Sequence, residues 1–83
     1  MFYVYVLQSK KDHDLYIGRA RNLERRFKEH NGGRVPSTKS RVPFVLVYYE
    51  AYREENDAIR REEKLKTGQQ RELLRERING SMI

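Results

Sequence analysis

The segment FYVYVLQ at positions 2–8 constrains the fold more than any other stretch of this 83-residue chain, because nearly all of its residues are β-branched or aromatic. Both alternating sets are apolar, namely Phe2, Val4 and Val6 in one set and Tyr3, Tyr5 and Leu7 in the other. A strand that is apolar on both faces is typical of a sheet covered on both sides. We therefore predict a central strand here.

Two more strands are expected. The polar residues 9–14 are typical of a hairpin loop, and residues 15–17 then return as a second short strand that we expect to end at Gly18. Residues 44–49 are again apolar on both faces and predict a third strand.

Three helices are predicted between and after these strands. The first follows Asn22, a favourable N-cap residue, and ends at the glycines 32–33 after about eight to ten residues. The second is expected over residues 56–66, with the asparagine at its start as the cap and Gly68 as its stop. The third is expected over residues 69–77.

The predicted order ββαβαα indicates an α+β fold, in which a small, largely antiparallel three-stranded sheet is flanked by helices. A chain of 83 residues has room for one domain, which we place at residues 1–83. The lack of cysteine excludes disulfides, thiolate metal sites and a cysteine nucleophile. Because no apolar run approaches the roughly 18 residues of a membrane span, we expect a soluble, cytoplasmic protein.

Lysine and arginine total 18 against 12 aspartate and glutamate residues, which gives a net charge of +6. The excess is local, since eight basic residues but only two acidic ones lie between positions 19 and 41. This patch favours a polyanionic partner such as nucleic acid, and the alternative is a solubilising surface. In the polar connection before the third strand, Arg34, Lys39 and Arg41 are predicted to contact backbone phosphates.

Glu62 falls in the middle of the only apolar stripe of the second predicted helix. Moving a carboxylate away from water costs several kcal/mol unless the carboxylate is paired or bound to a cation. Two interpretations follow: an ion pair with Arg26 or Lys66, or a divalent-metal ligand at the edge of a pocket. Base rates alone favour the ion pair.

Arg26 and His30 are spaced i, i+4 on the first predicted helix and would point to one spot. The structural alternatives are a histidine favoured by the helix dipole and an arginine whose aliphatic stem covers the sheet.

Tyrosines form a third cluster. Tyr3 and Tyr5 share one face of the first strand and Tyr16 lies on its hairpin partner, so three phenols are expected on one side. They could simply fill the core with their hydroxyls at the rim. A phenol titrates near pH 10, so a base at neutral pH would need nearby cations, for which Arg19 and Arg26 are candidates.

Phosphodiester hydrolysis requires a group that deprotonates water, positive charge for the transition state and often a divalent ion. The candidate residues of this chain supply all three. The tripeptides YVY at positions 3–5 and YIG at positions 16–18 resemble the paired motif of the GIY-YIG nuclease superfamily. The stretches RARNLERRFKEHN and AIRREEKLK extend the resemblance over nearly the whole chain, and it is strongest to the small stand-alone bacterial members.

The resemblance implies a role for each candidate residue. Tyr16 would be the general base that activates water, and Tyr5 would help to place the nucleophile or the phosphate. Arg26 would stabilise the transition state. Arg19 stands where the family often has lysine or arginine, and His30 matches a position that some members fill with histidine.

By the same resemblance, Glu62 would hold a single Mg²⁺ or Mn²⁺ and the chain would be a DNA endonuclease in repair or recombination. Branched or structured DNA, and also RNA, are compatible substrates, and a protein partner could supply targeting. Tyr3 replaces the first glycine of the motif, and residues 67–70 contain no asparagine, which many members carry after the glutamate helix. The alternative function is therefore a non-catalytic or partner-activated nucleic-acid-binding module.

Overall fold

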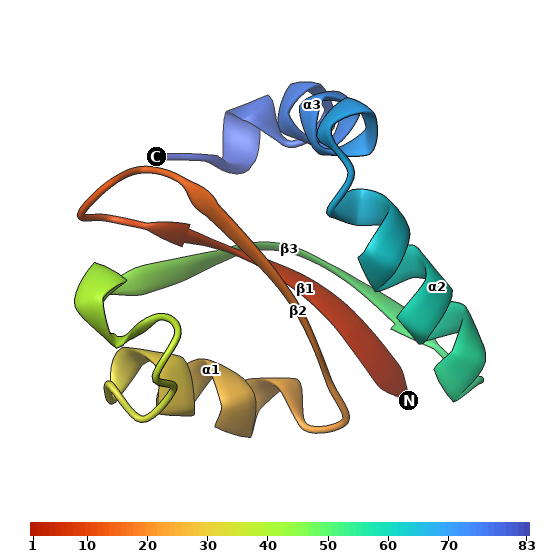
Figure 1. Ribbon diagram of the computed structural model, residues 1–83, viewed down its shortest axis with the longest axis horizontal. Coiled ribbons are helices and arrows are strands. Elements are labelled where there is room, and N and C mark those ends of the chain that lie inside the picture. Colours follow the sequence, from red (N-terminus) through yellow and green to blue (C-terminus); the bar gives the residue numbers. More distant parts are fainter.

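The computed structural model describes all 83 residues. Its sheet contains the strands β1 (Phe2–Ser9), β2 (Leu15–Ala20) and β3 (Phe44–Tyr52) in the order β2-β1-β3, and both pairings are antiparallel. The strand with two apolar faces is therefore central, as predicted (Figure 1).

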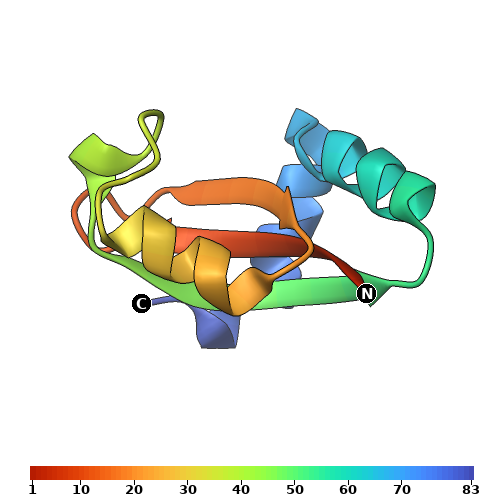
Figure 2. The same ribbon diagram turned by 90° about the horizontal axis from the view of Figure 1, so that it is seen from below.

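Helices cover both faces of this sheet. Helix α1 (Leu23–Asn31) lies against one face, while α2 (Glu55–Leu65) and α3 (Gly68–Arg77) lie toward the other, as Figures 1 and 2 show from two directions. Two 3₁₀ turns complete the chain, η1 (Lys39–Arg41) and η2 (Asn79–Ser81). The predicted α+β fold and its element order are confirmed. None of the α-helices has the length and apolar character needed to span a bilayer.

Two apolar clusters fill the spaces between these layers. On the α1 face, buried Tyr5, Leu7 and Phe44 form the smaller cluster. On the opposite face, a cluster of eight buried residues joins β1 and β2 to α2 and α3, namely Val4, Val6, Leu15, Ile17, Ala58, Leu65, Leu74 and Ile78. The alternation of side chains along β1 thus distributes the core between both faces.

Helix α1 begins and ends where its sequence predicts. The side chain of Asn22 accepts a hydrogen bond from the backbone N–H of Arg25 at 3.0 Å, which satisfies one free donor of the first turn. At the other end, Gly32 donates to the carbonyl of Lys28, and Gly33 has a φ of +71°, a conformation that glycine adopts without strain.

Some boundaries differ from the prediction. Helix α2 begins at Glu55 after the N-cap residue Glu54, so Asn56 lies within its first turn. Gly68 is the first residue of α3 and does not end α2. The extended backbone of Thr67, with φ −71° and ψ 148°, separates the two helices.

Two strands are longer than predicted because their pairing with β1 continues. Gly18 does not end β2: it pairs with Tyr5, and the strand runs on to Ala20 opposite Tyr3. Strand β3 likewise extends to Tyr52.

Candidate active site

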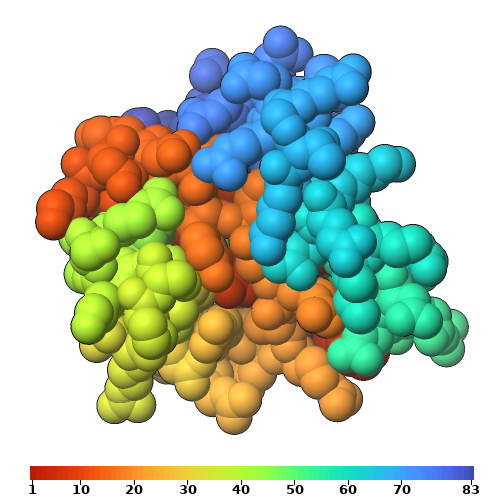
Figure 3. Space-filling view, viewed as in Figure 1, coloured from red at the N-terminus to blue at the C-terminus, as the bar shows by residue number.

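The molecule is hollowed over the edge strand β2. In Figure 3, the orange atoms of β2 lie between the yellow and green atoms of residues 33–41 on one side and the cyan atoms of α2 on the other. The chain therefore presents a concave surface bordered by α1, its following loop, β2 and α2.

Tyr5 and Tyr16 meet on the α1 side of this edge. Tyr16 pairs with Leu7, two residues from Tyr5, so the two phenols share a face, with ring centroids 6.4 Å apart. Tyr5 is 1% exposed, and its phenol lies over Gly18, where the Cβ of any other residue would overlap it. Gly18, the glycine of the YIG tripeptide, therefore makes room for the phenol of Tyr5.

The hydroxyl of Tyr16 is open to solvent. The Tyr16 hydroxyl has no hydrogen-bond partner in the chain. Since every buried side-chain oxygen and nitrogen does have a partner, this hydroxyl is not buried. It is therefore free to bind a substrate group or a water molecule.

His30 lies beneath the two phenols and is fully buried. Its Nε2 is 2.8 Å from the Tyr5 hydroxyl and its Nδ1 is 2.8 Å from Oγ1 of Thr38. Its ring also packs edge-on against Tyr16, with centroids 5.1 Å apart. Burial lowers the pKa of His30, and the positive charge of Arg26 lowers it further, so the imidazole is neutral at physiological pH.

Arg26 projects from α1 beside Tyr5 and is paired with Glu29 at 3.2 Å. Hydrogen bonding with the Tyr5 hydroxyl raises the pKa of Arg26. Burial raises the pKa of Tyr5 to about 12, although Arg26 acts in the opposite direction. Tyr5 is therefore a protonated phenol at neutral pH, while Arg26 is a partly exposed cation.

Glu62 lies on the other side of β2. Its carboxylate is bound by Arg19 Nε at 3.2 Å and by Lys66 Nζ at 3.0 Å, and its side chain is 16% exposed. Lys66 was an expected partner. The second partner is Arg19 and not Arg26, because Arg19 lies opposite Val4 on the face of β2 that α2 covers.

The expected catalytic residues thus form two groups separated by the backbone of β2. One contains Tyr5, Tyr16, Arg26 and His30 on the α1 side, and the other contains Arg19 and Glu62 on the α2 side. The negative charge of Glu62 contributes to the raised pKa of Tyr5, so the two groups interact electrostatically.

The three basic residues expected to bind phosphate occupy different environments. Arg34 and Lys39 are exposed and form no ion pair. Arg41 is held by Asp12, with Nε 2.7 Å from the carboxylate, and its guanidinium lies over the ring of Phe44.

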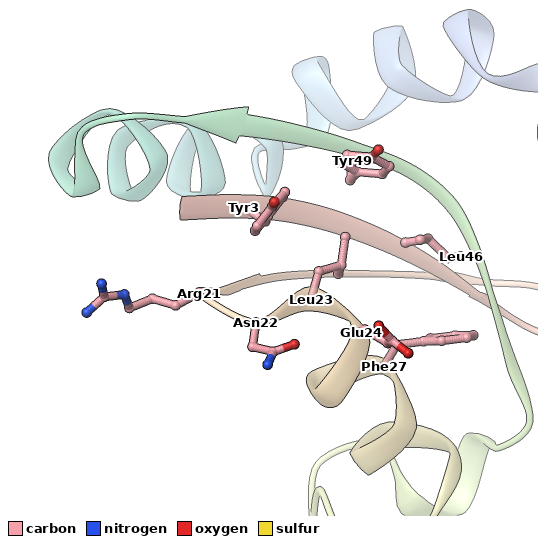
Figure 4. A pocket seen from close by; sticks show the side chains of 8 residues that line it. All are labelled: Tyr3, Arg21, Asn22, Leu23, Glu24, Phe27, Leu46 and Tyr49. Carbon is pink, nitrogen blue, oxygen red and sulfur yellow. The ribbon is translucent and has the colours of Figure 1, made fainter. Parts of the chain in front are cut away.

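Tyr3 shares a face with Tyr5 but lies outside the hollow over β2. Its ring packs edge-on against Tyr49 at 5.9 Å, in a groove of about 540 Å³ between α1 and β3 (Figure 4). The groove is lined by Tyr3, Arg21, Asn22, Leu23, Glu24, Phe27, Leu46 and Tyr49. None of the expected catalytic or metal-binding residues lines this groove. The candidate site therefore contains the phenols of Tyr5 and Tyr16, and the expected third phenol, Tyr3, lies elsewhere.

The structure adds residues that the sequence did not single out. Thr38 is fully buried against His30, and Glu29 neutralises Arg26 one turn along α1. The i, i+3 spacing of Arg26 and Glu29 was a usable signal for that pair. Thr38 carries no comparable signal, because it lies in a polar connection whose path only the tertiary structure defines.

The donor atoms can be tested against a divalent ion. No group of three or more histidine or acidic side chains that could hold a metal ion occurs in the chain. Glu62 offers one carboxylate, partly shielded from water at the border of the hollow. Mg²⁺ usually keeps several waters and is bound through one or two protein carboxylates together with substrate phosphates. Glu62 fits this mode of binding and not an all-protein cage.

The chain thus combines a small α+β fold with polar groups on both sides of the edge strand β2. The model of the GIY-YIG catalytic domain family matches residues 1–78, and the chain therefore belongs to this nuclease domain family. The resemblance noted in the paired tripeptides is confirmed.

Relatives of similar size align with most of the chain. A UPF0213 protein from Staphylococcus haemolyticus is 40% identical over 74 residues, which are 88% of this chain and 89% of the relative. Another from Clostridium perfringens is 43% identical over 67 residues, which are 80% of this chain and 71% of the relative. A solution NMR structure of a UPF0213 protein from Bacillus halodurans is 35% identical, covers 89% of this chain and 82% of its own, and superposes with a TM-score of 0.57.

Proposed function

We propose that this protein is a metal-dependent endonuclease that hydrolyses phosphodiester bonds in DNA. The observation that carries the proposal is the placement of Tyr5, Tyr16 and Arg26 on one side of the edge strand β2 and of Glu62 on its other side. Membership of a nuclease domain family implies a nucleic acid substrate. The net charge of +6 favours the same class of substrate.

Arg26 is the residue that we assign to the transition state. Hydrolysis adds negative charge to the phosphate oxygens, and a preorganised cation stabilises that charge. The ion pair with Glu29 holds the guanidinium in place, and the neighbouring Tyr5 hydroxyl raises its pKa. Arg19 is a second cation at the border of the hollow.

Tyr16 is the residue that we assign to the attacking water. Its hydroxyl is the one in the site without a partner in the chain, and it lies beside Tyr5 and His30. We propose that it orients the water and acts as the general base, as the family resemblance implies.

Glu62 is the residue that would hold one Mg²⁺ or Mn²⁺, together with phosphate oxygens of the substrate. Such an ion would neutralise charge on the scissile phosphate. Arg19 and Lys66 occupy the carboxylate oxygens in the free chain. A phosphate that attracts Arg19 would free one of these oxygens.

The surface for the nucleic acid backbone would lie beside the hollow, on the loop after α1. Arg34 and Lys39 have no acidic partner there, and Lys11 lies next to them, with its Nζ donating to the carbonyl of Ser40 at 3.0 Å. Arg41, although paired with Asp12, borders the same surface. Contacts of this kind position a backbone without reading sequence.

The test is a cleavage assay of the purified protein on labelled single-stranded, duplex, flap and branched DNA and on RNA, with Mg²⁺, Mn²⁺ or EDTA. Metal-dependent cutting supports the proposal, and preference for flap or branched DNA would support a role in repair or recombination. Salt-sensitive binding without cutting would contradict the proposal.

Binding without cutting would instead favour a non-catalytic binding module. The two ion pairs of Glu62 support this alternative, because they occupy the carboxylate that would hold the metal. Cutting that appears only with a partner protein would identify a partner-activated enzyme.

A further inference from the structure

A chain of buried hydrogen bonds runs from the loop after α1 to the candidate active site. Oγ1 of Thr38 is 3.4 Å from the carbonyl oxygen of Val35 and 2.8 Å from Nδ1 of His30. Nε2 of His30 is in turn 2.8 Å from the Tyr5 hydroxyl. Thr38 and His30 are fully buried and Tyr5 is 1% exposed, so water does not interrupt the chain.

Only one arrangement of protons satisfies every bond when the imidazole is neutral. The Val35 carbonyl can only accept, so Thr38 donates its single hydroxyl proton to it. The Thr38 oxygen must then accept from His30, which places the imidazole proton on Nδ1. Nε2 is left with a lone pair, and the hydroxyl of Tyr5 donates to it.

The surroundings of His30 favour the neutral ring. Tyr5 faces it from β1, Tyr16 from β2, and Arg26 and Glu29 from α1. Burial lowers the pKa of His30 first, Arg26 lowers it further, and Glu29 only partly compensates. A buried imidazolium next to an arginine is therefore disfavoured.

We propose that Thr38 is a positioning residue that sets the donor and acceptor pattern of the active site. It holds His30 in the tautomer protonated on Nδ1, so that the Tyr5 hydroxyl donates inward and presents only oxygen lone pairs to the reacting groups. This inference rests on the proposed nuclease function, and it assigns a residue and a tautomer that the proposed function does not require.

The pattern selects between the two roles open to Tyr5. With its proton committed to His30, Tyr5 can accept a hydrogen bond from Arg26 or from the attacking water. It cannot donate one to a phosphate oxygen, because the lone pairs of the Tyr5 hydroxyl would then face the lone pairs of that oxygen. Tyr5 therefore helps to place Arg26 and the nucleophile, and does not bind the phosphate.

The test compares the wild-type protein with Thr38→Val, which keeps the shape but removes the hydroxyl, and with Thr38→Ser, which keeps the hydroxyl. Long-range ¹H–¹⁵N NMR spectra report the tautomer of each histidine, and exposed His13 serves as an internal reference. We expect His30 to carry its proton on Nδ1 in the wild type and in Thr38→Ser. In Thr38→Val we expect a shift toward the Nε2–H form.

Cleavage gives the second readout. We expect Thr38→Val to lower kcat by about tenfold, the effect of about 1.4 kcal/mol, with DNA affinity unchanged, and Thr38→Ser to restore it. Wild-type activity should also fall as the pH drops below the lowered pKa of His30, because Nε2–H would then turn the Tyr5 proton outward.

The inference is overturned if wild-type His30 is protonated on Nε2, or if Thr38→Val leaves both the tautomer and kcat unchanged. The NMR readout needs no substrate. A protein that cuts no nucleic acid would contradict the proposed function, while the tautomer would still decide whether Thr38 sets the pattern.

Discussion

Gly18 of β2 pairs with Tyr5 of β1, and the phenol of Tyr5 fills the space that a side chain at position 18 would need. The Tyr5 hydroxyl is in turn hydrogen-bonded to His30. A single position without a side chain thus sets where the buried hydroxyl of the site lies.

We expect Gly18→Ala to displace Tyr5, because the added Cβ would overlap its hydroxyl and ring. Overpacking of this kind costs about 1–3 kcal/mol, which urea unfolding would measure. Gly68→Ala is the matched control, since nothing lies within 4 Å of a Cβ at Gly68. Equal stability of the two variants would contradict the account of this contact.

Arg26→Lys should lower kcat by about 100-fold to 1,000-fold, as expected for removal of a preorganised donor to developing charge. Lysine keeps the charge but loses the planar fork of donors. Arg25→Lys is the control, because Arg25 is exposed on the same helix and forms no ion pair. Single-turnover rates with saturating protein measure the effect, and a similar rate for both variants would show that Arg26 has no role in the chemical step.

Replacement of Arg34, Lys39 and Arg41 by alanine should flatten the salt dependence of DNA binding. On duplex DNA, each lost phosphate contact removes about 0.9 from the slope of log K against log salt. Arg41→Ala alone should also release Asp12, whose pKa Arg41 and the backbone of Asp14 lower to about 2. Fluorescence anisotropy at several salt concentrations measures the slope, and an unchanged slope in the triple variant would exclude this surface.

We expect the stability of the folded protein to depend on pH through the carboxylate of Glu50. This carboxylate accepts hydrogen bonds from Nε and Nη2 of Arg61, at 2.8 Å and 3.0 Å, and from the hydroxyls of Tyr48 and Tyr52. Burial raises the pKa of Glu50, but hydrogen bonds from Arg61 and the two tyrosines outweigh this effect and lower it overall below 4.5.

The charged form of Glu50 is thus favoured in the folded state. Its stabilising contribution is complete above about pH 4.5 and is lost as the pH falls through the lower pKa of the folded state. Glu50→Gln should destabilise the protein by about 1–3 kcal/mol at pH 7, because Arg61 loses a charged partner, and the difference from wild type should shrink in acid. Urea midpoints between pH 3 and pH 7 measure this, and a difference that is constant with pH would contradict it.

Much of the fold could be predicted from local patterns. The two apolar faces of residues 2–8 require cover on both sides, and this places β1 in the centre without any knowledge of contacts. Asn22 and the glycines 32–33 define α1 because capping depends on a few adjacent residues. Gly68 misled the prediction, since glycine is compatible with both ends of a helix and the break lies at Thr67.

The candidate site was only partly predictable. A carboxylate on an apolar stripe signals that Glu62 needs a cation, but Arg19 is 43 residues away and becomes its partner only through the packing of α2 on β2. The bond between His30 and Thr38 likewise depends on how the loop after α1 folds back. Contacts of this kind require the tertiary structure, because no periodicity connects their residues.

In the function that we propose, DNA is hydrolysed at the β2 edge with a divalent ion held by Glu62. The most direct measurement compares cleavage of one labelled DNA substrate in Mn²⁺ by wild type, Glu62→Gln and Glu63→Gln. Glu63 is the matched control, because it is an exposed neighbour on α2 that forms no ion pair. The account predicts cutting by wild type and Glu63→Gln, and at least a 100-fold loss in Glu62→Gln with DNA binding retained. Equal cutting by all three proteins would contradict it.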